Sequence, residues 1–176
     1  WDGRGEWPCI LAALGRGDQI EVIHREYFPN SIGQAYQAIS QYLGFSDMGD
    51  EYKVMGLSAY GEPKFKETFK KFIKVKKGRV TINQSYMNYY IYNREMADRF
   101  SLNMTRELGV ARREQEPIEQ RHMDIARSLQ DRVNEVGVEV ASSLRSRFGD
   151  TKLCLAGGVA QNIILNHKIF SAAGFD

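Results

Sequence analysis

The chain has 176 residues, 43% of them hydrophobic and 26% charged, which is the composition of a globular domain with a buried core. Twenty-four basic and 22 acidic residues leave a formal net charge of +2, too balanced for a dedicated nucleic-acid-binding protein. No apolar run approaches the roughly 20 residues of a membrane-spanning helix. Because Cys9 and Cys154 lie in apolar runs, we expect two buried, reduced thiols and a cytoplasmic protein.

Two strands and a helix are predicted at the start of the chain. Residues 7–17 and 18–28 have the composition of strands, and the glycines where they meet favour a tight hairpin turn. Ser31 and Gln34 then have the spacing of a capping box, and apolar residues follow three and four apart. We expect a helix that begins after Ser31 and stops at Gly44.

A basic segment follows at residues 64–79, with eight basic residues and one acidic residue. Phe65, Phe69 and Phe72 recur within it at helical spacing, which predicts an amphipathic surface helix with its cationic side chains in solvent. Binding of RNA or phosphate is the alternative, but a run of charges is more often a solvated face.

One long helical pattern dominates the second half of the chain. After a predicted strand and an irregular tyrosine-rich segment (residues 78–93), Pro117 marks a helix start, and apolar residues recur at spacings of three and four as far as Phe148. This pattern predicts a helix of about 30 residues. It leads to a predicted buried strand, Lys152 to Ala156, and then to a further helix, so the fold class is mixed α/β.

Three short segments could carry chemistry, and the first is "DGRGE" near the start of the chain. Glycines beside polar residues free backbone N–H groups to face an anion, and a carboxylate in such a turn can hold a metal-bound water or orient a nucleophile. Asp2, Gly3, Gly5 and Glu6 are therefore candidate ligand-binding residues. An ordinary turn is the alternative.

The second segment is "GDEYKVMGLSAYGEP", residues 49–63, in which Lys53 lies between Tyr52 and Val54. Burial of an unpaired ammonium group costs several kcal/mol, so this lysine fits a pure core element poorly. Lys53 is either a point charge that reaches a phosphate or carboxylate, or a solvated side chain, or one paired with Glu51.

The third segment is "LAGGVAQNIILN". A strand that ends in Gly157 and Gly158 lets the backbone pass close to a flat or anionic ligand, and the next helix adds N–H donors and a partial positive charge. Asn162 and Asn166 are four residues apart, so both project from one face of that helix. Close packing of helix on strand is the alternative role for the glycines.

Covalent and metal chemistry have no signature in the sequence. No two of the three histidines have the spacing of metal ligands, and we expect His122 in the core and His24 and His167 on the surface of a strand and a helix. P-loop, nucleophile-elbow and paired-cysteine motifs are absent. Catalysis would then depend on positioning and electrostatics.

Five segments stand in a recognisable order: "DGRGEW", "FPNSIGQAYQAISQYLGF", "DEYKVMGLSAYGEP", "HMDIARSLQDRVNE" and "LCLAGGVAQNIILNHKI". Together they resemble the ATP-dependent O-carbamoyltransferases of the NodU and NolO nodulation-protein type, over nearly the whole chain. The resemblance implies an actin/Hsp70/sugar-kinase-like, RNase H-like ATPase domain, similar to the threonylcarbamoyl-adenosine synthase subunit. It also implies an enzyme that makes carbamoyl-adenylate from carbamoyl phosphate and ATP and passes the carbamoyl group to an acceptor hydroxyl, releasing AMP.

Site residues follow from the resemblance. The "DGRGE" candidates would form the phosphate-facing loop, and Lys53 would act beside the adenylate as the catalytic residue. Gly157, Gly158, Val159 and Asn162 would border the adenosine. The acceptor would be a hydroxyl of a sugar, an antibiotic or a nodulation-factor-type molecule, with no nucleic-acid partner.

Three parts of the family pattern are missing from residues 1–176: a histidine-rich metal motif that precedes the "DG" turn, a metal-binding aspartate that follows the adenosine motif, and the carboxy-terminal domain that handles carbamoyl phosphate. We therefore expect one fragment of the nucleotide-binding domain, inactive alone, whose divalent metal (iron or magnesium) has its ligands in other parts of the protein. Two alternatives are a tRNA threonylcarbamoylation subunit and a non-catalytic, nucleotide-dependent scaffold with the actin-like fold.

Overall fold

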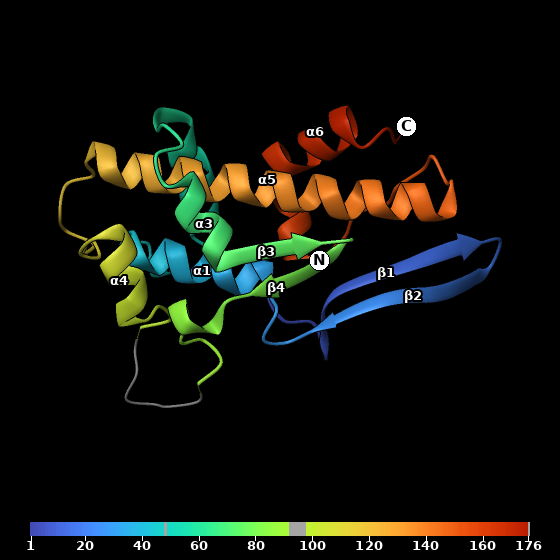
Figure 1. The fold of residues 1–176 in the computed structure, drawn as a ribbon, viewed down its shortest axis with the longest axis horizontal. Coiled ribbons are helices and arrows are strands. Elements are labelled where there is room, and N and C mark those ends of the chain that lie inside the picture. The colour runs from blue at the N-terminus through green and yellow to red at the C-terminus, as the bar shows by residue number, and fades with distance from the viewer. Residues whose placement is uncertain (48, 92–97, 176) are drawn as a thin grey trace.

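The computed structural model describes residues 1–47, 49–91 and 98–175. Helices combine with two antiparallel pairs of strands, which confirms the mixed α/β class (Figure 1). Residues 92 and 93, at the end of the predicted tyrosine-rich segment, lie outside the described residues.

The predicted hairpin is present as β1 (Pro8–Arg16) and β2 (Gln19–Tyr27), which pair antiparallel. The turn needs a glycine, because Gly17 has φ +62°. Irregularities in the register after Pro8 and at Ala12 mark bulges, which bend the pair. The long hairpin extends beyond the helical part of the molecule (Figure 1).

The predicted first helix is confirmed as α1 (Ile32–Tyr42). Its N-cap is Ser31, whose Oγ accepts a hydrogen bond from the backbone N–H of Gln34 at 3.0 Å. Gly44 has φ +78° and ends the helix as expected. A short helix, α2 (Glu51–Leu57), follows and continues into a 3₁₀ turn at Ser58–Tyr60.

The prediction of one helix over residues 64–79 is wrong. The segment forms a shorter helix, α3 (Lys66–Phe72), and then the strand β3 (Ile73–Lys76), which pairs with β4 (Arg79–Ile82). Lys77 and Gly78 have φ of 52° and 75°, which is the geometry of a tight hairpin turn. The alternation Ile-Lys-Val-Lys has period two, and this strand pattern was hidden within a longer run of basic residues.

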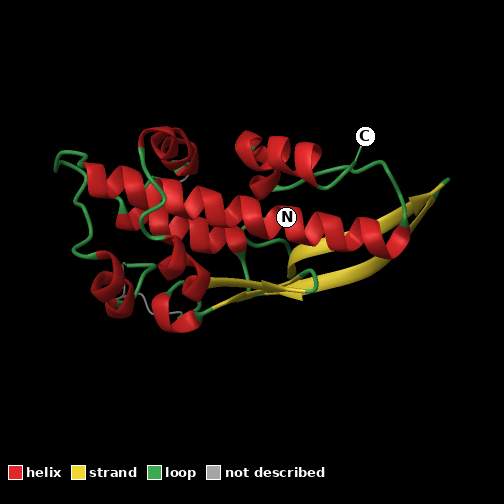
Figure 2. Cartoon of the chain, turned by 45° about the horizontal axis from the view of Figure 1, so that its top comes forward, coloured by secondary structure: helices red, strands yellow, loops and turns green. Residues whose placement is uncertain are grey.

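The long helix is confirmed as α5 (Gln120–Phe148), 29 residues long. It begins three residues after Pro117, because Glu119 and His122 form its capping box, and it ends at Gly149, which has φ +74°. A short helix, α4 (Leu102–Leu108), precedes it, and α6 (Ile163–Ala172) follows. α5 runs the length of the molecule, with α6 along one side and the β1–β2 hairpin along another (Figures 1 and 2).

The predicted buried strand from Lys152 to Ala156 is wrong for the described structure. These residues have no ladder partner among the described residues, and all but Leu153 are exposed. The Cys154 thiol is also exposed, against expectation, whereas Cys9 is buried. The physical reason is that a strand needs a neighbour for its backbone N–H and C=O groups, and the described chain offers none here.

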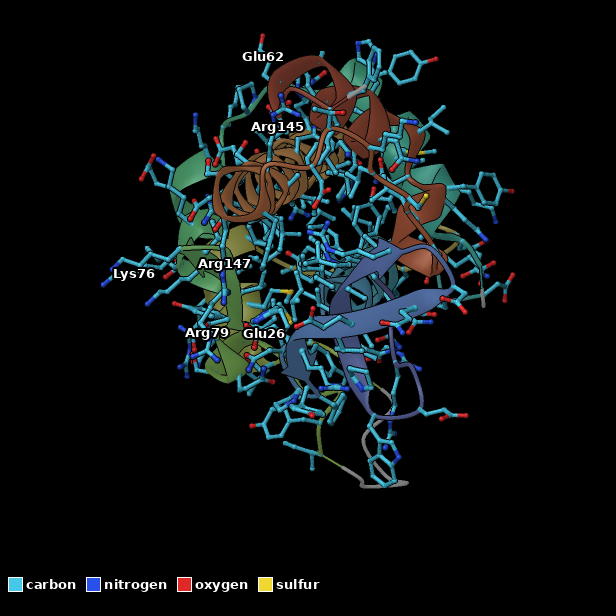
Figure 3. All side chains as sticks on the ribbon, turned by 90° about the vertical axis from the view of Figure 1, so that its right-hand side faces the viewer. Glu26, Glu62, Lys76, Arg79, Arg145 and Arg147 are labelled. Atoms are coloured by element: carbon cyan, nitrogen blue, oxygen red, sulfur yellow. The ribbon has the colours of Figure 1, made fainter. Side chains whose placement is uncertain are left out.

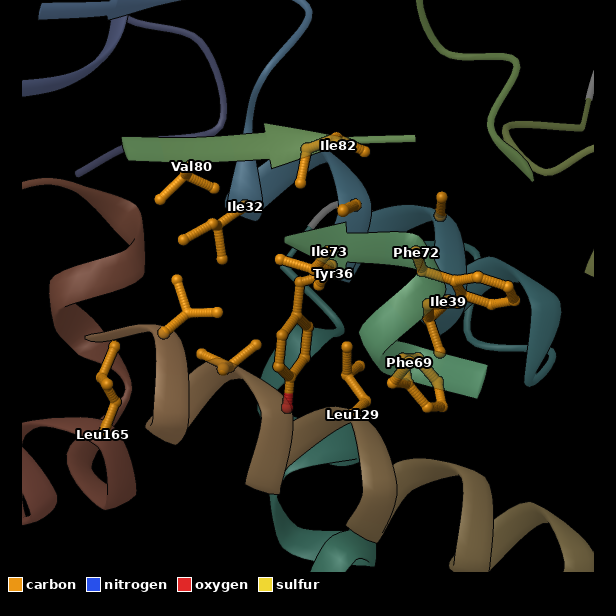
Figure 4. Close-up of a cluster of buried hydrophobic side chains, with 14 of the residues drawn as sticks. Ile32, Tyr36, Ile39, Phe69, Phe72, Ile73, Val80, Ile82, Leu129 and Leu165 are labelled. Atoms are coloured by element: carbon orange, nitrogen blue, oxygen red, sulfur yellow. The ribbon is translucent and has the colours of Figure 1, made fainter. Parts of the chain in front are cut away.

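The core lies between α1, α3, the β3–β4 pair and α5 (Figure 4). Its fully buried side chains include Ile39, Phe69, Phe72 and Leu129. The apolar faces of the amphipathic helices converge on this cluster, so the core fixes α1 against α5 and thereby places the loops at the ends of both helices.

Candidate functional site

The two glycine-containing loops, far apart in sequence, meet in space. The backbone nitrogen of Trp1 donates a hydrogen bond to the carbonyl oxygen of Ala156 at 2.8 Å, across a separation of 155 residues. The Val159 N–H donates back to the Trp1 carbonyl oxygen at 3.2 Å. The segment predicted to face phosphates and the segment predicted to border adenosine therefore begin next to each other.

Gly157 permits this close approach. It has φ +98°, and a Cβ at this position would collide with the backbone carbonyl of Trp1. A Cβ on Gly158 would lie 3.3 Å from the Oδ1 of Asp2, so this glycine also faces the first loop. Both glycines are exposed, and their N–H groups have no acceptor within the described part of the chain. Two open donors at the start of the helical segment suit an anionic ligand.

The N-terminus of α1 also bonds to the loop at residues 1–3. The Ser31 hydroxyl donates to the carbonyl oxygens of Gly3 (2.5 Å) and Asp2 (3.3 Å), while Gly3 N–H donates to the Asp2 Oδ1 at 2.7 Å. A Cβ on Gly33 would lie 2.6 Å from the Gly3 Cα. Sequence analysis missed Gly33, although a glycine in the first turn of a helix is a signal of close backbone approach.

Gly5 and Glu6 lie further along the same turn and have different surroundings. A Cβ on Gly5 would lie 2.6 Å from the carbonyl oxygen of Pro8, so this glycine serves the tight entry into β1. The Glu6 side chain is exposed. The structure thus brings Trp1 and Asp2 to the Gly157 loop, whereas Gly3 contacts the N-terminus of α1 and Gly5 contacts Pro8.

The side-chain amide of Asn162 is part of a hydrogen-bond network that leads into the protein interior. Its Oδ1 accepts from the Leu165 N–H at 2.9 Å, which makes it the N-cap of α6, and from the Gln130 Nε2 at 3.1 Å. Its Nδ2 donates to the Gln130 Oε1 at 2.9 Å. Asn162 borders the glycine loop through its backbone, while its amide ties the start of α6 to α5.

The network extends from Gln130 into the core. The Tyr36 hydroxyl donates to the Gln130 Oε1 at 3.1 Å, and the Gln130 Nε2 donates to the Asn134 Oδ1 at 2.9 Å. Figure 4 shows the Tyr36 ring directed from α1 toward α5. Burial raises the pKa of Tyr36 well above its ordinary value, so its hydroxyl stays neutral. From the sequence, Tyr36 is predicted only as one of the apolar residues of the first helix, and no role is predicted for Gln130.

Asn162 and Asn166 were expected to project from one face of the helix, but their side-chain amides have different partners within the protein. The Nδ2 of Asn166 donates to the Ala160 carbonyl oxygen at 2.7 Å and supports the turn before α6. Its Oδ1 is buried without a hydrogen-bond partner in the described structure.

Lys53 lies on α2 and is 39% exposed. Its Nζ is 2.7 Å from the Oδ1 of Asp50, one helical turn earlier, and not beside Glu51, the partner considered from the sequence. The hydrogen bond to Asp50 raises the pKa of Lys53, so the ammonium is charged at neutral pH. The hydrogen bonds of the glycine loops do not include it.

The second half of "EYKVMGLSAYGEP" packs on α5. A Cβ on Gly61 would overlap the backbone of Met123, so only glycine allows this approach. The Asp124 carboxylate accepts from the Glu62 N–H at 2.9 Å and pairs with the Lys64 Nζ at 3.0 Å. Burial would raise the pKa of Asp124, but these hydrogen bonds and that of Gln120 outweigh it and lower the pKa.

The basic segment is largely paired with acidic side chains. The pairs are Lys64 with Asp124, Lys66 with Glu135, Lys70 with Glu67, Lys71 with Glu107 and Arg79 with Glu26. Figure 3 shows Arg79 beside Glu26, with Lys76 directed into solvent. Pairing with acids from other elements agrees with a solvated surface rather than with a nucleic-acid interface.

Metal-binding groups are absent from this part of the protein. Across residues 1–47, 49–91 and 98–175, no three His, Cys, Asp or Glu side chains are placed to hold a metal ion. His122 is buried in the capping box as expected, His24 bonds Glu26 at 3.0 Å, and His167 is exposed. No described helix is long and apolar enough to cross a membrane.

A mostly apolar cavity of about 650 Å³ adjoins the junction. Its lining includes Trp1, Asp2, Gly157 and Val159, together with residues of β1, β2, α5 and α6 and residues 152–156. The junction of the two glycine-containing segments therefore forms part of the cavity wall.

Comparisons with known proteins identify the family of the chain. The family model described as carbamoyltransferase N-terminus matches residues 1–176. Nodulation protein NolO of Bradyrhizobium diazoefficiens is 35% identical over 99% of this chain and 30% of its own length. Nodulation protein NolNO of Sinorhizobium fredii is 33% identical over 99% of this chain and 24% of its own. The uncharacterized protein sll1178 of Synechocystis is 35% identical over 99% of this chain and 28% of its own. The chain thus spans less than a third of the length of these relatives.

Proposed function

Because the chain belongs to the carbamoyltransferase N-terminus family, we propose that it supplies the nucleotide-binding elements of an enzyme that transfers a carbamoyl group. Carbamoyl phosphate would first lose inorganic phosphate to water and give carbamate. A carbamate oxygen would then attack the α-phosphorus of ATP and expel pyrophosphate, which gives carbamoyl-adenylate. An acceptor hydroxyl would attack the carbamoyl carbon of this intermediate and lose its proton while AMP leaves. The acceptor class is a sugar, an antibiotic or a nodulation-factor-type molecule. The remaining parts of a longer protein would bind carbamoyl phosphate.

The observation that carries this proposal is the junction of the Trp1–Gly3 loop with the Gly157–Val159 loop. A mixed anhydride needs no protein nucleophile, so fixed N–H donors at the reacting phosphate can supply the stabilisation. The open N–H groups of Gly157 and Gly158 are such donors, and the N-terminus of α6 behind them adds positive potential. We therefore place the adenosine beside Gly157, Gly158, Val159 and Asn162, in what we propose is an actin-like ATPase domain.

Asp2 places a negative charge at the phosphate end of the proposed site. Its carboxylate lies beside Gly158 and would repel a bare phosphate, so a cation would have to stand between them. The described residues do not assemble a metal site of their own, and one carboxylate does not fit a resident iron or magnesium ion. We therefore derive no step through a metal in this chain. Gly3, Gly5 and Glu6 complete the loop that would face the phosphates.

Lys53 is the residue we propose to act at the carbamoyl or phosphate end. Its ammonium is charged, partly exposed and held by Asp50, so it can reorient toward an anionic ligand at the cost of one surface ion pair. We place the reaction in the cytoplasm, in agreement with two free cysteines.

The experiment measures ATP and AMP binding and carbamoyl transfer in the full-length protein. Gly158→Ala and Lys53→Ala are each expected to weaken nucleotide affinity or turnover at least tenfold. Lys70→Ala is the matched control, because Lys70 also pairs with an acid three residues away, Glu67. If the first two variants bind and turn over like Lys70→Ala, the proposed site is wrong.

A further inference from the structure

A second cavity, of about 380 Å³, lies where the β1–β2 hairpin, the turn between β3 and β4 and the last turns of α5 meet. Ile10 of β1 and Val140 and Leu144 of α5 give it an apolar wall. Trp1 and Gly157, which form the junction of the two glycine-containing segments, do not line it. It is therefore separate from the site proposed for the nucleotide.

The ionisable side chains that line this cavity are all basic. Lys77 lies in the β3–β4 turn, Arg79 begins β4, Arg147 lies in the last turn of α5, and His24 comes from β2. No Asp or Glu occurs among the described residues of the lining. Positive charges gathered around a small cavity attract an anion more strongly than the same charges dispersed in solvent do.

The permanent cations of this cluster are poorly compensated by acids. In the described structure, Lys77 and Arg147 have no ion pair, and the Arg147 guanidinium lies 5 Å or less from a ring, with its Cζ 4.9 Å from the centroid of Phe148. The Glu26 Oε1 is 3.7 Å from the Nε of Arg79, which is beyond hydrogen-bond distance. Three permanent positive charges beside one carboxylate leave a surplus of positive charge.

The β3–β4 turn packs closely on α5, which fixes Lys77 at the cavity. A Cβ on Gly78 would lie 2.9 Å from the Oγ of Ser143. Lys77 has φ +52°, a left-handed conformation that Asn or Gly adopts at lower cost, so the turn itself does not require a lysine. Ser143 also lines the cavity, and its hydroxyl is a further hydrogen-bond donor.

Arg147 and Arg145 lie on different sides of α5. Figure 3 shows Arg147 on the side toward Arg79 and Glu26, and Arg145 on the other side. Arg145 lines the larger cavity instead. Both arginines lie in the last turn of the helix, where a cation offsets the helix dipole, and both stack on a phenylalanine ring. Only the direction of Arg147 toward the other cations is particular to the second cavity.

We propose that this cavity binds a phosphate group, either as inorganic phosphate or as the monoester of a small molecule. The planar guanidinium groups of Arg79 and Arg147 suit bidentate contacts with phosphate oxygens, and Lys77 adds a point charge. The apolar wall formed by β1 and α5 offers a surface for the organic part of an ester. The inference does not depend on the proposed nucleotide chemistry.

A small anion fits this cavity better than a nucleic acid does. Its volume is within the range of small-molecule sites, which begins at about 300 Å³. A nucleic acid needs a row of free cations along an exposed face, but the lysines of residues 64–71 on the same part of the chain each have an acidic partner.

The experiment titrates inorganic phosphate into the full-length protein by calorimetry, with AMP present in excess to occupy the proposed nucleotide site. Arg147→Ala and Lys77→Asn are each expected to weaken phosphate binding about tenfold, because each removes a charge-assisted contact. Asn is chosen at position 77 because it tolerates the positive φ and keeps the turn.

The matched controls are Arg145→Ala, in the same helical turn, and Lys76→Asn, next to Lys77 but directed into solvent (Figure 3). Both are expected to bind phosphate as the unmodified protein does. If Arg147→Ala and Arg145→Ala bind phosphate equally well, Arg147 serves only the helix end and the proposal is overturned. Absence of phosphate binding to the unmodified protein at about 10 mM would also overturn it.

A second titration with glycerol 3-phosphate distinguishes the two sources of the phosphate group. Binding that is tighter than that of inorganic phosphate and is weakened by Arg147→Ala supports the proposal and assigns the site to phosphomonoesters. Weaker binding than that of inorganic phosphate, with the same effect of Arg147→Ala on the inorganic ion, supports it and assigns the site to the free ion.

Discussion

The carbonyl group of Trp1 occupies the space in which a side chain on Gly157 would begin. This contact joins Trp1 to the loop before α6, where Gly157 has a positive φ of +98°. A side chain at position 157 would therefore keep the loop before α6 away from Trp1 and Asp2.

Gly157→Ala is expected to destabilise the full-length protein by about 2–4 kcal/mol, because it adds a steric clash to an unfavourable φ. Gly49→Ala is the matched control, since Gly49 has φ +95° but open space around its Cβ position. The control is expected to cost about 1 kcal/mol. Urea unfolding measures both values, and equal costs would show that the contact with Trp1 contributes nothing.

Asp124→Asn is expected to lower stability at neutral pH by about 1–3 kcal/mol, because hydrogen bonds to a buried charged acceptor are lost or weakened. The folded-state pKa of Asp124 is lowered, so its contribution is complete above the unfolded pKa of about 3.9 and is lost as the pH falls through the folded value. The difference between the two proteins should therefore shrink below about pH 4. Urea midpoints at pH 7 and pH 3 test this, and a constant difference would contradict it.

His122 is expected to make stability fall on mild acidification. Burial, followed by the nearby Arg121 guanidinium, lowers the pKa of His122, and its Nδ1 accepts the Glu119 N–H at 2.9 Å. The neutral ring is favoured in the folded state, so stability is highest above the unfolded pKa of about 6.5 and declines as the pH falls from there to the folded value. His122→Gln should flatten the pH dependence of the urea midpoint between pH 7.5 and 5. An unchanged pH dependence in this variant would contradict the prediction.

Gln130→Leu is expected to cost about 1–3 kcal/mol, because the Tyr36 hydroxyl and the Asn162 amide lose their partner inside the protein. Gln161→Leu, an exposed substitution in the 3₁₀ turn before α6, should stay within about 0.5 kcal/mol. Thermal unfolding of both variants measures the difference. If Gln130→Leu is as stable as Gln161→Leu, the network does not hold α6 against α5.

The sequence predicted the elements whose signals are local. The hairpin of β1 and β2, the Ser31 cap and the 29-residue α5 all follow from periodicity, turn glycines and capping residues, and the structure confirms them. The single helix predicted for the basic segment is wrong, because aromatic residues at helical spacing precede a strand that begins at Ile73. A strand of four residues is too short for its alternation to outweigh the helical pattern before it.

The sequence by itself determined the family, through motifs that match over the whole chain, and it identified the two glycine loops. Only the tertiary structure decided how these residues are used. It joined Trp1 and Asp2 to the Gly157 loop, paired Lys53 with Asp50, and bonded the Asn162 amide to Gln130. The physical reason is that propensity and capping act within a few residues of the chain, whereas a contact across 155 residues depends on how the core packs α1 against α5.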